Sequence, residues 1–165
     1  MIEEEIKRAK NLYERHGEAL TNQDGLGDLF MSYRNAITKT QEVMEQMGVV
    51  EGCTACACAG RGSCCYQGVE EWYDDALLLM NLVLGIQLPE FRELPEGCLF
   101  VGSGGCKLLA RHSFCVNYLC PSLKDLIKTP HMGTLLSVSG DELFRGWELE
   151  QSIRRWLQKS PLIPL

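Results

Sequence analysis

The chain has 165 residues, a mass of 18.5 kDa and a formal net charge of −6, from 16 basic and 22 acidic residues. A chain of this length can bury a sizeable core without help from disulfides, so we expect a single domain over 1–165. The acidic balance disfavours a nucleic-acid partner, because such proteins bind by neutralising phosphates.

Two features of the chain argue against export and against a membrane partner. Residues 1–5 are acidic and lack the basic-then-apolar order of a secretory signal, so we expect a cytoplasmic protein. The longest apolar run, 76–86, includes Asn81 and Gly85 and falls short of the about 20 residues that span a bilayer. We predict a buried helix there.

Helical spacing of apolar residues dominates the N-terminal part of the chain. It predicts an amphipathic helix from Ile2 to Leu20, followed by a turn over 21–27, where the sequence is TNQDGLG. A second helix is predicted from Asp28 to Gly48, antiparallel to the first.

Three more helices are predicted further along the chain. The segment 69–87 is acidic at its start and then almost wholly apolar, which is typical of a central helix. Prolines bracket an extended linker over 89–95, and Pro121 favours a short helix over 121–128. A last helix is predicted over 141–159, with these buried candidates: Leu143, Trp147, Ile153 and Trp156.

Few strand signals appear, so the predicted fold class is mainly α: a small helical domain with irregular cysteine-rich loops around a metal centre. The cysteine-cluster core is expected over about 50–125. Helical flanks are expected over 1–48 and 140–160.

Nine cysteines are the strongest chemical signal in the chain, and they fall in two clusters. In a reducing compartment they would persist as thiols or metal ligands rather than disulfides. The predicted metal ligands are Cys53, Cys56, Cys58, Cys64, Cys65, Cys98, Cys106, Cys115 and Cys120. Cys53 and Cys56 have the C-x2-C spacing that lets two sulfurs bind one ion. The adjacent Cys64 and Cys65 favour two metal sites, a bridged cluster, or one non-ligating thiol.

The charge around the cysteines is opposite to that of the whole chain. Segments 53–65 and 98–128 carry a local charge of +4, from Arg61, Lys107, Arg111, Lys124 and Lys128 against Asp125. Cations stabilise metal-bound thiolates, which leave net negative charge. A patch for a small anion or an acidic partner is the competing interpretation.

This order of cysteines resembles the YkgJ-type cysteine-cluster family, also called the CxxCxxCC family of zinc- or iron-chelating domains. The similarity covers about 50–125, and the family's eight cysteines match Cys53, Cys56, Cys64, Cys65, Cys98, Cys106, Cys115 and Cys120. The spacer before Cys64 is longer than in the family, and Cys58 is extra. The resemblance implies chelation of zinc or of an iron–sulfur cluster.

The predicted function is therefore metal binding, zinc or iron–sulfur, with a structural, chelating or electron-transfer role. One alternative is an enzyme that uses an open metal site or a reactive thiol for redox or methyl-transfer chemistry. For that thiol we consider Cys115 or Cys120, near Arg111 and His112. Another is an interaction module whose protein partner the sequence does not identify.

Several polar residues carry structural predictions instead. We expect His112 and His131 to be structural or exposed rather than ligands, and His16 to be solvated. The acidic residues of 70–75 are predicted to form a solvated helix start, and Gly102–Gly105 a turn rather than a phosphate loop.

Overall fold

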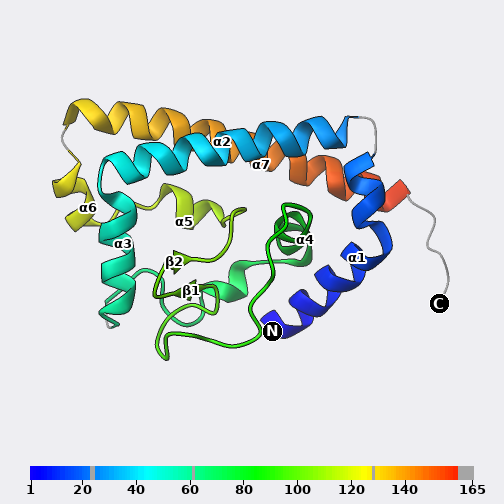
Figure 1. The fold of residues 1–165 in the computed structure, drawn as a ribbon, viewed down its shortest axis with the longest axis horizontal. Coiled ribbons are helices and arrows are strands. Elements are labelled where there is room, and N and C mark those ends of the chain that lie inside the picture. Colours follow the sequence, from blue (N-terminus) through cyan, green and yellow to red (C-terminus); the bar gives the residue numbers. More distant parts are fainter. Residues whose placement is uncertain (23–24, 61, 128, 160–165) are drawn as a thin grey trace.

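The computed structural model describes residues 1–22, 25–60, 62–127 and 129–159. The described chain is mainly helical, as predicted, with one short hairpin (Figure 1). Its elements are α1 (Ile2–Asn22), α2 (Leu26–Gln46), α3 (Val49–Cys58), the 3-10 helix η1 (Val69–Trp72), α4 (Asp75–Val83), β1 (Val101–Gly102), β2 (Gly105–Cys106), α5 (Ser113–Asn117), α6 (Pro121–Leu126) and α7 (Thr129–Lys159).

Helices α2 and α7 form an antiparallel pair along one long side of the molecule (Figure 1). Their shared face buries Tyr33 and Ile37 of α2 against Leu149 and Ile153 of α7. Gly146 permits the close approach, because a Cβ there would lie 3.0 Å from the Tyr33 ring. This pair forms the base on which the rest of the chain packs.

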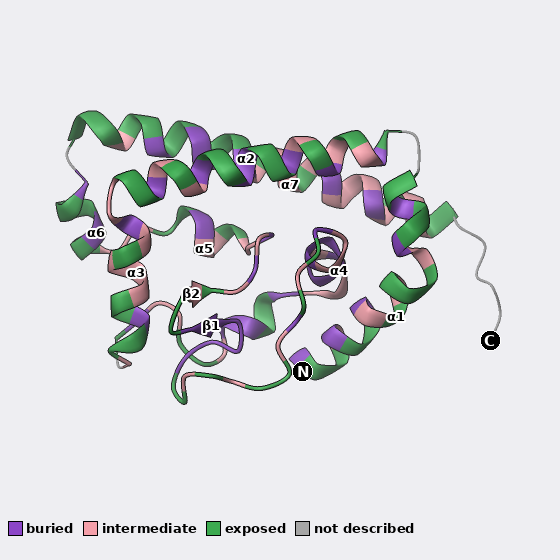
Figure 2. Ribbon diagram, viewed as in Figure 1, coloured by how far each residue is buried: buried purple, intermediate pink, exposed green. Residues whose placement is uncertain are grey.

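Helix α1 packs on α4 through a regular apolar stripe that includes Ile2, Ile6 and Ala9. The stripe follows the predicted period, because these residues lie on one face of a 3.6-residue helix. Helix α4 is buried at its centre, at Ala76, Leu78, Leu79 and Met80, whereas its other apolar residues are half-buried (Figure 2). The prediction of a buried helix over 76–86 is therefore confirmed for its centre only, because the helix ends at Val83 and Gly85 is exposed.

Asn81, in the middle of α4, holds the segment that leads to the second cysteine cluster. Its side-chain oxygen accepts from the N–H groups of Leu109 (2.9 Å) and Ala110 (3.0 Å), and its amide donates to the Ala110 carbonyl (2.8 Å) and to Leu77 (3.0 Å). Asn81 has no exposed surface. This polar residue in an apolar helix therefore fixes a loop that makes few backbone hydrogen bonds of its own.

The first cysteine cluster corrects one prediction, since part of it is helical. Cys53, Cys56 and Cys58 lie on α3 rather than in an irregular loop. The left-handed Gly48 (φ 71°) ends α2 and lets the chain turn at once into α3, whose alanines favour a helix.

The predicted central helix over 69–87 is also corrected, because it is broken. After η1 the backbone is extended at Tyr73, and α4 begins anew where Asp74 accepts from the Leu77 N–H at 2.9 Å. The helix ends at Val83, before the left-handed Gly85.

Helix α7 begins twelve residues before the predicted start at Asp141. Leu135 and Val138 pack on the residues around α6, which keeps the segment helical despite Gly133 and Gly140. Of the four buried candidates, Ile153 is buried, Leu143 and Trp156 are half-buried, and Trp147 is exposed. Within the described ranges, no helix is long and apolar enough to cross a membrane.

Candidate functional site

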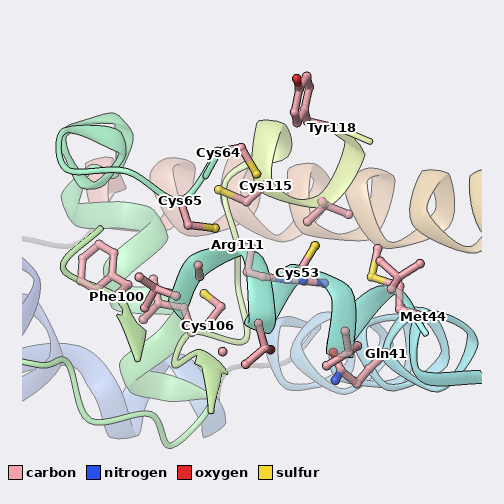
Figure 3. Close-up of a pocket in the computed structure, with 18 of the residues that line it drawn as sticks. Gln41, Met44, Cys53, Cys64, Cys65, Phe100, Cys106, Arg111, Cys115 and Tyr118 are labelled. Carbon is pink, nitrogen blue, oxygen red and sulfur yellow. The ribbon is translucent and has the colours of Figure 1, made fainter. Parts of the chain in front are cut away.

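Six of the nine cysteines line one cavity of about 440 Å³, which lies between α3, the hairpin and α5 (Figure 3). The six are Cys53, Cys64, Cys65, Cys98, Cys106 and Cys115. They come from four segments: α3, the 64–65 pair, the stretch from Cys98 to β2, and α5. The fold therefore brings both predicted clusters to one place.

Backbone hydrogen bonds join the two cysteine segments directly. The Cys98 N–H donates to the Cys65 carbonyl at 2.8 Å, and the neighbouring Gln67 N–H donates to the Glu96 carbonyl at 3.0 Å. Tyr66 and Gly97 form an antiparallel bridge at the same point. These contacts set the distance between the clusters before any ligand is bound.

The hairpin and α5 supply Cys106 and Cys115 to the cavity lining. Strands β1 and β2 pair Val101 with Cys106, across a turn that the left-handed Gly105 (φ 95°) permits. The expectation of a turn over Gly102–Gly105 is thus confirmed.

Tyr73 ties α5 to the wall of the cavity. Its hydroxyl accepts from the His112 N–H at 3.0 Å and donates to the Cys115 sulfur at 3.8 Å. His112 in turn caps α5, because its Nδ1 accepts from the Phe114 N–H at 3.2 Å. The predicted structural role of His112 is confirmed, and His131 is exposed.

Three predicted ligands lie outside the cavity lining. Cys56 and Cys58 are exposed on α3. Cys120 is half-buried at the start of α6 and packs with the apolar cluster that includes Leu123. Cys56 and Cys120 still lie near Cys53, since Cys56 is three residues further along α3 and Cys120 packs on the same apolar cluster as Cys53.

Burial is the main influence on the thiols of the cavity. It raises the pKa of Cys53 to about 11 and that of Cys98 to about 12, because desolvation disfavours a thiolate. Burial also raises the pKa of Cys106 and Cys115. Cys106 is an exposed residue that also belongs to the cavity lining (Figure 3). Most cavity thiols are therefore protonated at neutral pH.

Cys64 is the exception. The Cys65 thiol donates to it, which lowers the pKa of Cys64 to about 6 and raises that of Cys65. The Cys65 N–H also donates to the Ser63 hydroxyl at 3.1 Å, so the turn that carries the pair is ordered. This vicinal pair holds one readily formed thiolate beside one thiol.

Arg111 is the cation that reaches the cavity thiols. Its charge lowers the pKa of Cys53, Cys106 and Cys115, and it lines the cavity in Figure 3. Its side chain is 15% exposed, and Nη2 lies 3.7 Å from Oε1 of Glu142 on α7. Among the other predicted cations, Lys107 pairs with Glu93 at 2.7 Å, and Arg61 and Lys128 lie outside the described residues.

Within the acidic segment 70–75, Glu70 departs from the prediction of a solvated helix start, whereas Glu71 is exposed and Asp74 and Asp75 begin α4 as predicted. Glu70 is buried, pairs with Arg92 and accepts from the Gly68 N–H at 2.9 Å. Burial raises its pKa, but Arg92 and the hydrogen bonds lower it more, so the net shift is downward. Asp74 caps α4 and pairs with Arg154 at 2.5 Å. His16, predicted to be solvated, is half-buried with its ring against Trp156.

The donor chemistry of the cavity suits soft metal ions, because thiolate sulfur is the ligand that zinc and iron–sulfur centres use. The thiol side chains of the cavity do not converge on one common centre. Within 1–22, 25–60, 62–127 and 129–159, no group of three or more Cys, His, Asp or Glu side chains stands ready to hold one ion. Binding would therefore require thiol side chains to turn toward a common centre and lose protons.

Sequence reasoning missed three residues that shape this site: Tyr73, Asn81 and Glu142. The signal for Asn81 was present, since it is a polar residue within an apolar helical run. Nothing in the spacing of Tyr73 or Glu142 relates them to the cysteines, because both meet the site only through packing between distant elements.

Comparison of this chain with protein families, curated proteins and solved structures finds no match. No family model matches the chain, no curated protein matches it, and no solved structure matches it. The resemblance to the YkgJ-type family thus stays a prediction that depends on the order of the cysteines.

Proposed function

We propose that this protein binds a thiolate-ligated metal centre, zinc or iron–sulfur, in the cysteine-lined cavity. The observation that supports it is the convergence of six free thiols from four segments on one cavity, with Arg111 among them. Packing alone gives no reason for so many thiols to share a cavity, since a buried cysteine otherwise behaves as a small apolar residue. The resemblance to a chelating family agrees with the proposal.

The candidate ligands fall into two groups, according to which thiols influence one another's pKa. Cys53 interacts with Cys56, Cys64 and Cys120. On the other side, Cys65 interacts with Cys106 and Cys115, and so does Cys98. Cys64 and Cys65 join the two groups, which favours a polynuclear cluster or two ions over one four-coordinate ion. Cys58 belongs to neither group.

Zinc would supply a closed structural shell, and an iron–sulfur cluster would supply a site that carries an electron. The chain's own contribution is the same in both cases. It holds the thiols on α3, the 63–66 turn, the hairpin and α5, and Arg111 offsets part of their charge. Because most of these thiols are protonated at neutral pH, metal binding releases protons and strengthens as pH rises.

The test is to purify the protein without oxygen and measure metal, acid-labile sulfide and the visible spectrum per chain. Iron with sulfide and a brown colour supports a cluster, and near-integral zinc without colour supports a zinc site. Cys98→Ser is expected to lower the bound metal, whereas Cys58→Ser, the matched exposed control, leaves it unchanged. Absence of metal from both purified and reconstituted protein would contradict the proposal.

The Cys64–Cys65 pair favours a second candidate, thiol-based redox chemistry. The Cys64 thiolate would attack a disulfide of a partner molecule, form a mixed disulfide and expel the partner's second sulfur as a thiolate. Reduction of a small-molecule disulfide by wild-type protein but not by Cys64→Ser, at equal metal content, would select this function.

A further inference from the structure

Glu142 is a buried carboxylate with an incomplete set of partners, and its position beside Arg111 relates it to the cysteine-lined cavity. It lies on α7 with no exposed surface. Neither carboxylate oxygen has a hydrogen-bond partner in the described part of the chain. A buried charge in this state is costly unless it is paired.

The ion pair that Glu142 forms is a long one. The Arg111 guanidinium is its ion-pair partner, at 3.7 Å, which is longer than a charge-assisted hydrogen bond. The nearby Thr40 hydroxyl donates to the Ala36 and Val138 carbonyls, both at 3.1 Å, and Tyr33 is the other polar group beside Glu142. Arg111 is therefore held toward α7 by charge rather than by a fixed bidentate contact.

Arg111 also faces the other way, into the cavity. It lines the same cavity as Cys53, Cys106 and Cys115 (Figure 3). One guanidinium thus lies between the cavity thiols and a buried carboxylate, whose pKa is raised by burial against the opposing effect of the Arg111 charge. The two anionic sites compete for the same cation.

We propose that Glu142 competes with the cavity thiolates for Arg111, so that Glu142 weakens metal binding while Arg111 strengthens it. The inference rests on the proposed metal-binding function, and it assigns Glu142 a role as a positioning residue. When the thiols bind metal, the guanidinium moves from Glu142 toward the sulfurs. Because of this competition, the thiols release the metal more readily than they would if Arg111 had no carboxylate partner.

If Glu142 and Arg111 compete as proposed, substitutions of the two residues change the Zn²⁺ affinity in opposite directions. If the pair is merely structural, both substitutions lower it. Glu142→Gln keeps the shape of the side chain and frees Arg111, so Zn²⁺ affinity is expected to rise, on the order of tenfold. Arg111→Gln is expected to lower it by a similar factor, and Arg111→Lys to retain most of it. In the Arg111→Gln background, Glu142→Gln is expected to have no further effect.

The measurement is competition for Zn²⁺ with a chromophoric chelator under reducing conditions, with circular dichroism to confirm folding. Asp141→Asn is the matched control, because this neighbouring acid is exposed and pairs with Arg145 instead. If Glu142→Gln weakens Zn²⁺ binding as Arg111→Gln does, the pair is structural and the inference is wrong.

Alkylation of the metal-free protein provides a readout that does not depend on the proposed function. Glu142→Gln is expected to speed alkylation of Cys53 and Cys115 several-fold at pH 8, and Arg111→Gln to slow it. If the wild type binds no Zn²⁺ and these rates still change with opposite signs, metal binding fails while the competition for Arg111 stands. Unchanged rates overturn the competition.

Discussion

The Cys98 backbone N–H donates to the Cys65 carbonyl at 2.8 Å, and this hydrogen bond joins a cysteine of one cluster directly to a cysteine of the other. The bridge between Tyr66 and Gly97 extends it. Because both contacts use backbone atoms, the relation between the clusters does not depend on which side chains ligate. The cavity is therefore a property of the fold, and substitutions of single thiols are expected to leave it in place.

Asn81→Ala should destabilise the protein by about 3 kcal/mol, because it leaves the buried N–H groups of Leu109 and Ala110 without an acceptor. The free energy of unfolding from urea titration measures this loss. Asn35→Ala, on the exposed face of α2, is the matched control and is expected to be neutral or slightly stabilising. Equal effects of the two substitutions would show that Asn81 does not anchor the 107–112 segment.

Tyr73→Phe should cost about 1–3 kcal/mol of stability, because the His112 N–H loses its acceptor in a buried setting. The same change frees the Cys115 thiol from its hydroxyl partner. Thermal unfolding followed by circular dichroism measures the cost. Tyr13→Phe, at an exposed position of α1, is the control and should change the midpoint little. A midpoint for Tyr73→Phe equal to that of the wild type would contradict the role given to its hydroxyl.

Alkylation by iodoacetamide should distinguish Cys64 from Cys98. The pKa of Cys64 is lowered to about 6 and that of Cys98 is raised to about 12, so at pH 7 Cys64 reacts before Cys98. Mass spectrometry of peptides at timed intervals gives the order. Cys65→Ala removes the thiol that donates to Cys64 and is expected to slow its alkylation at pH 6.5. No change in that variant would mean that the donated hydrogen bond does not govern the reactivity of Cys64.

Glu70 should make stability depend on pH in the acid range. Its folded pKa is lowered below the about 4.3 of an unfolded glutamate, so its contribution is present above that value and is lost as pH falls through the folded pKa. Glu70→Gln is expected to flatten the fall of unfolding free energy between pH 5 and 3, measured by urea titration at each pH. Glu71→Gln, with a half-exposed side chain, is the control. A Glu70→Gln profile parallel to that of the wild type would exclude Glu70 as a source of acid sensitivity.

The helices were predictable where burial follows a local period. The apolar stripe of α1 and the apolar face of α2 follow from the spacing of apolar residues in the sequence. Both helices form close to the predicted bounds. The start of α7 was not predictable in this way. Its first turns have little periodic pattern, and they are held by Leu135 and Val138 against residues from other elements.

Composition and hydrophobic period were enough to predict the helical class and to single out nine cysteines among positive charge, because they report which residues need burial or a partner. The packing of the helices, in contrast, selects which six thiols share a cavity. It also decided that Asn81 anchors their loop and that Glu142 meets Arg111. These contacts join residues that are far apart in the chain, and they depend on how the helices pack, which local spacing does not encode.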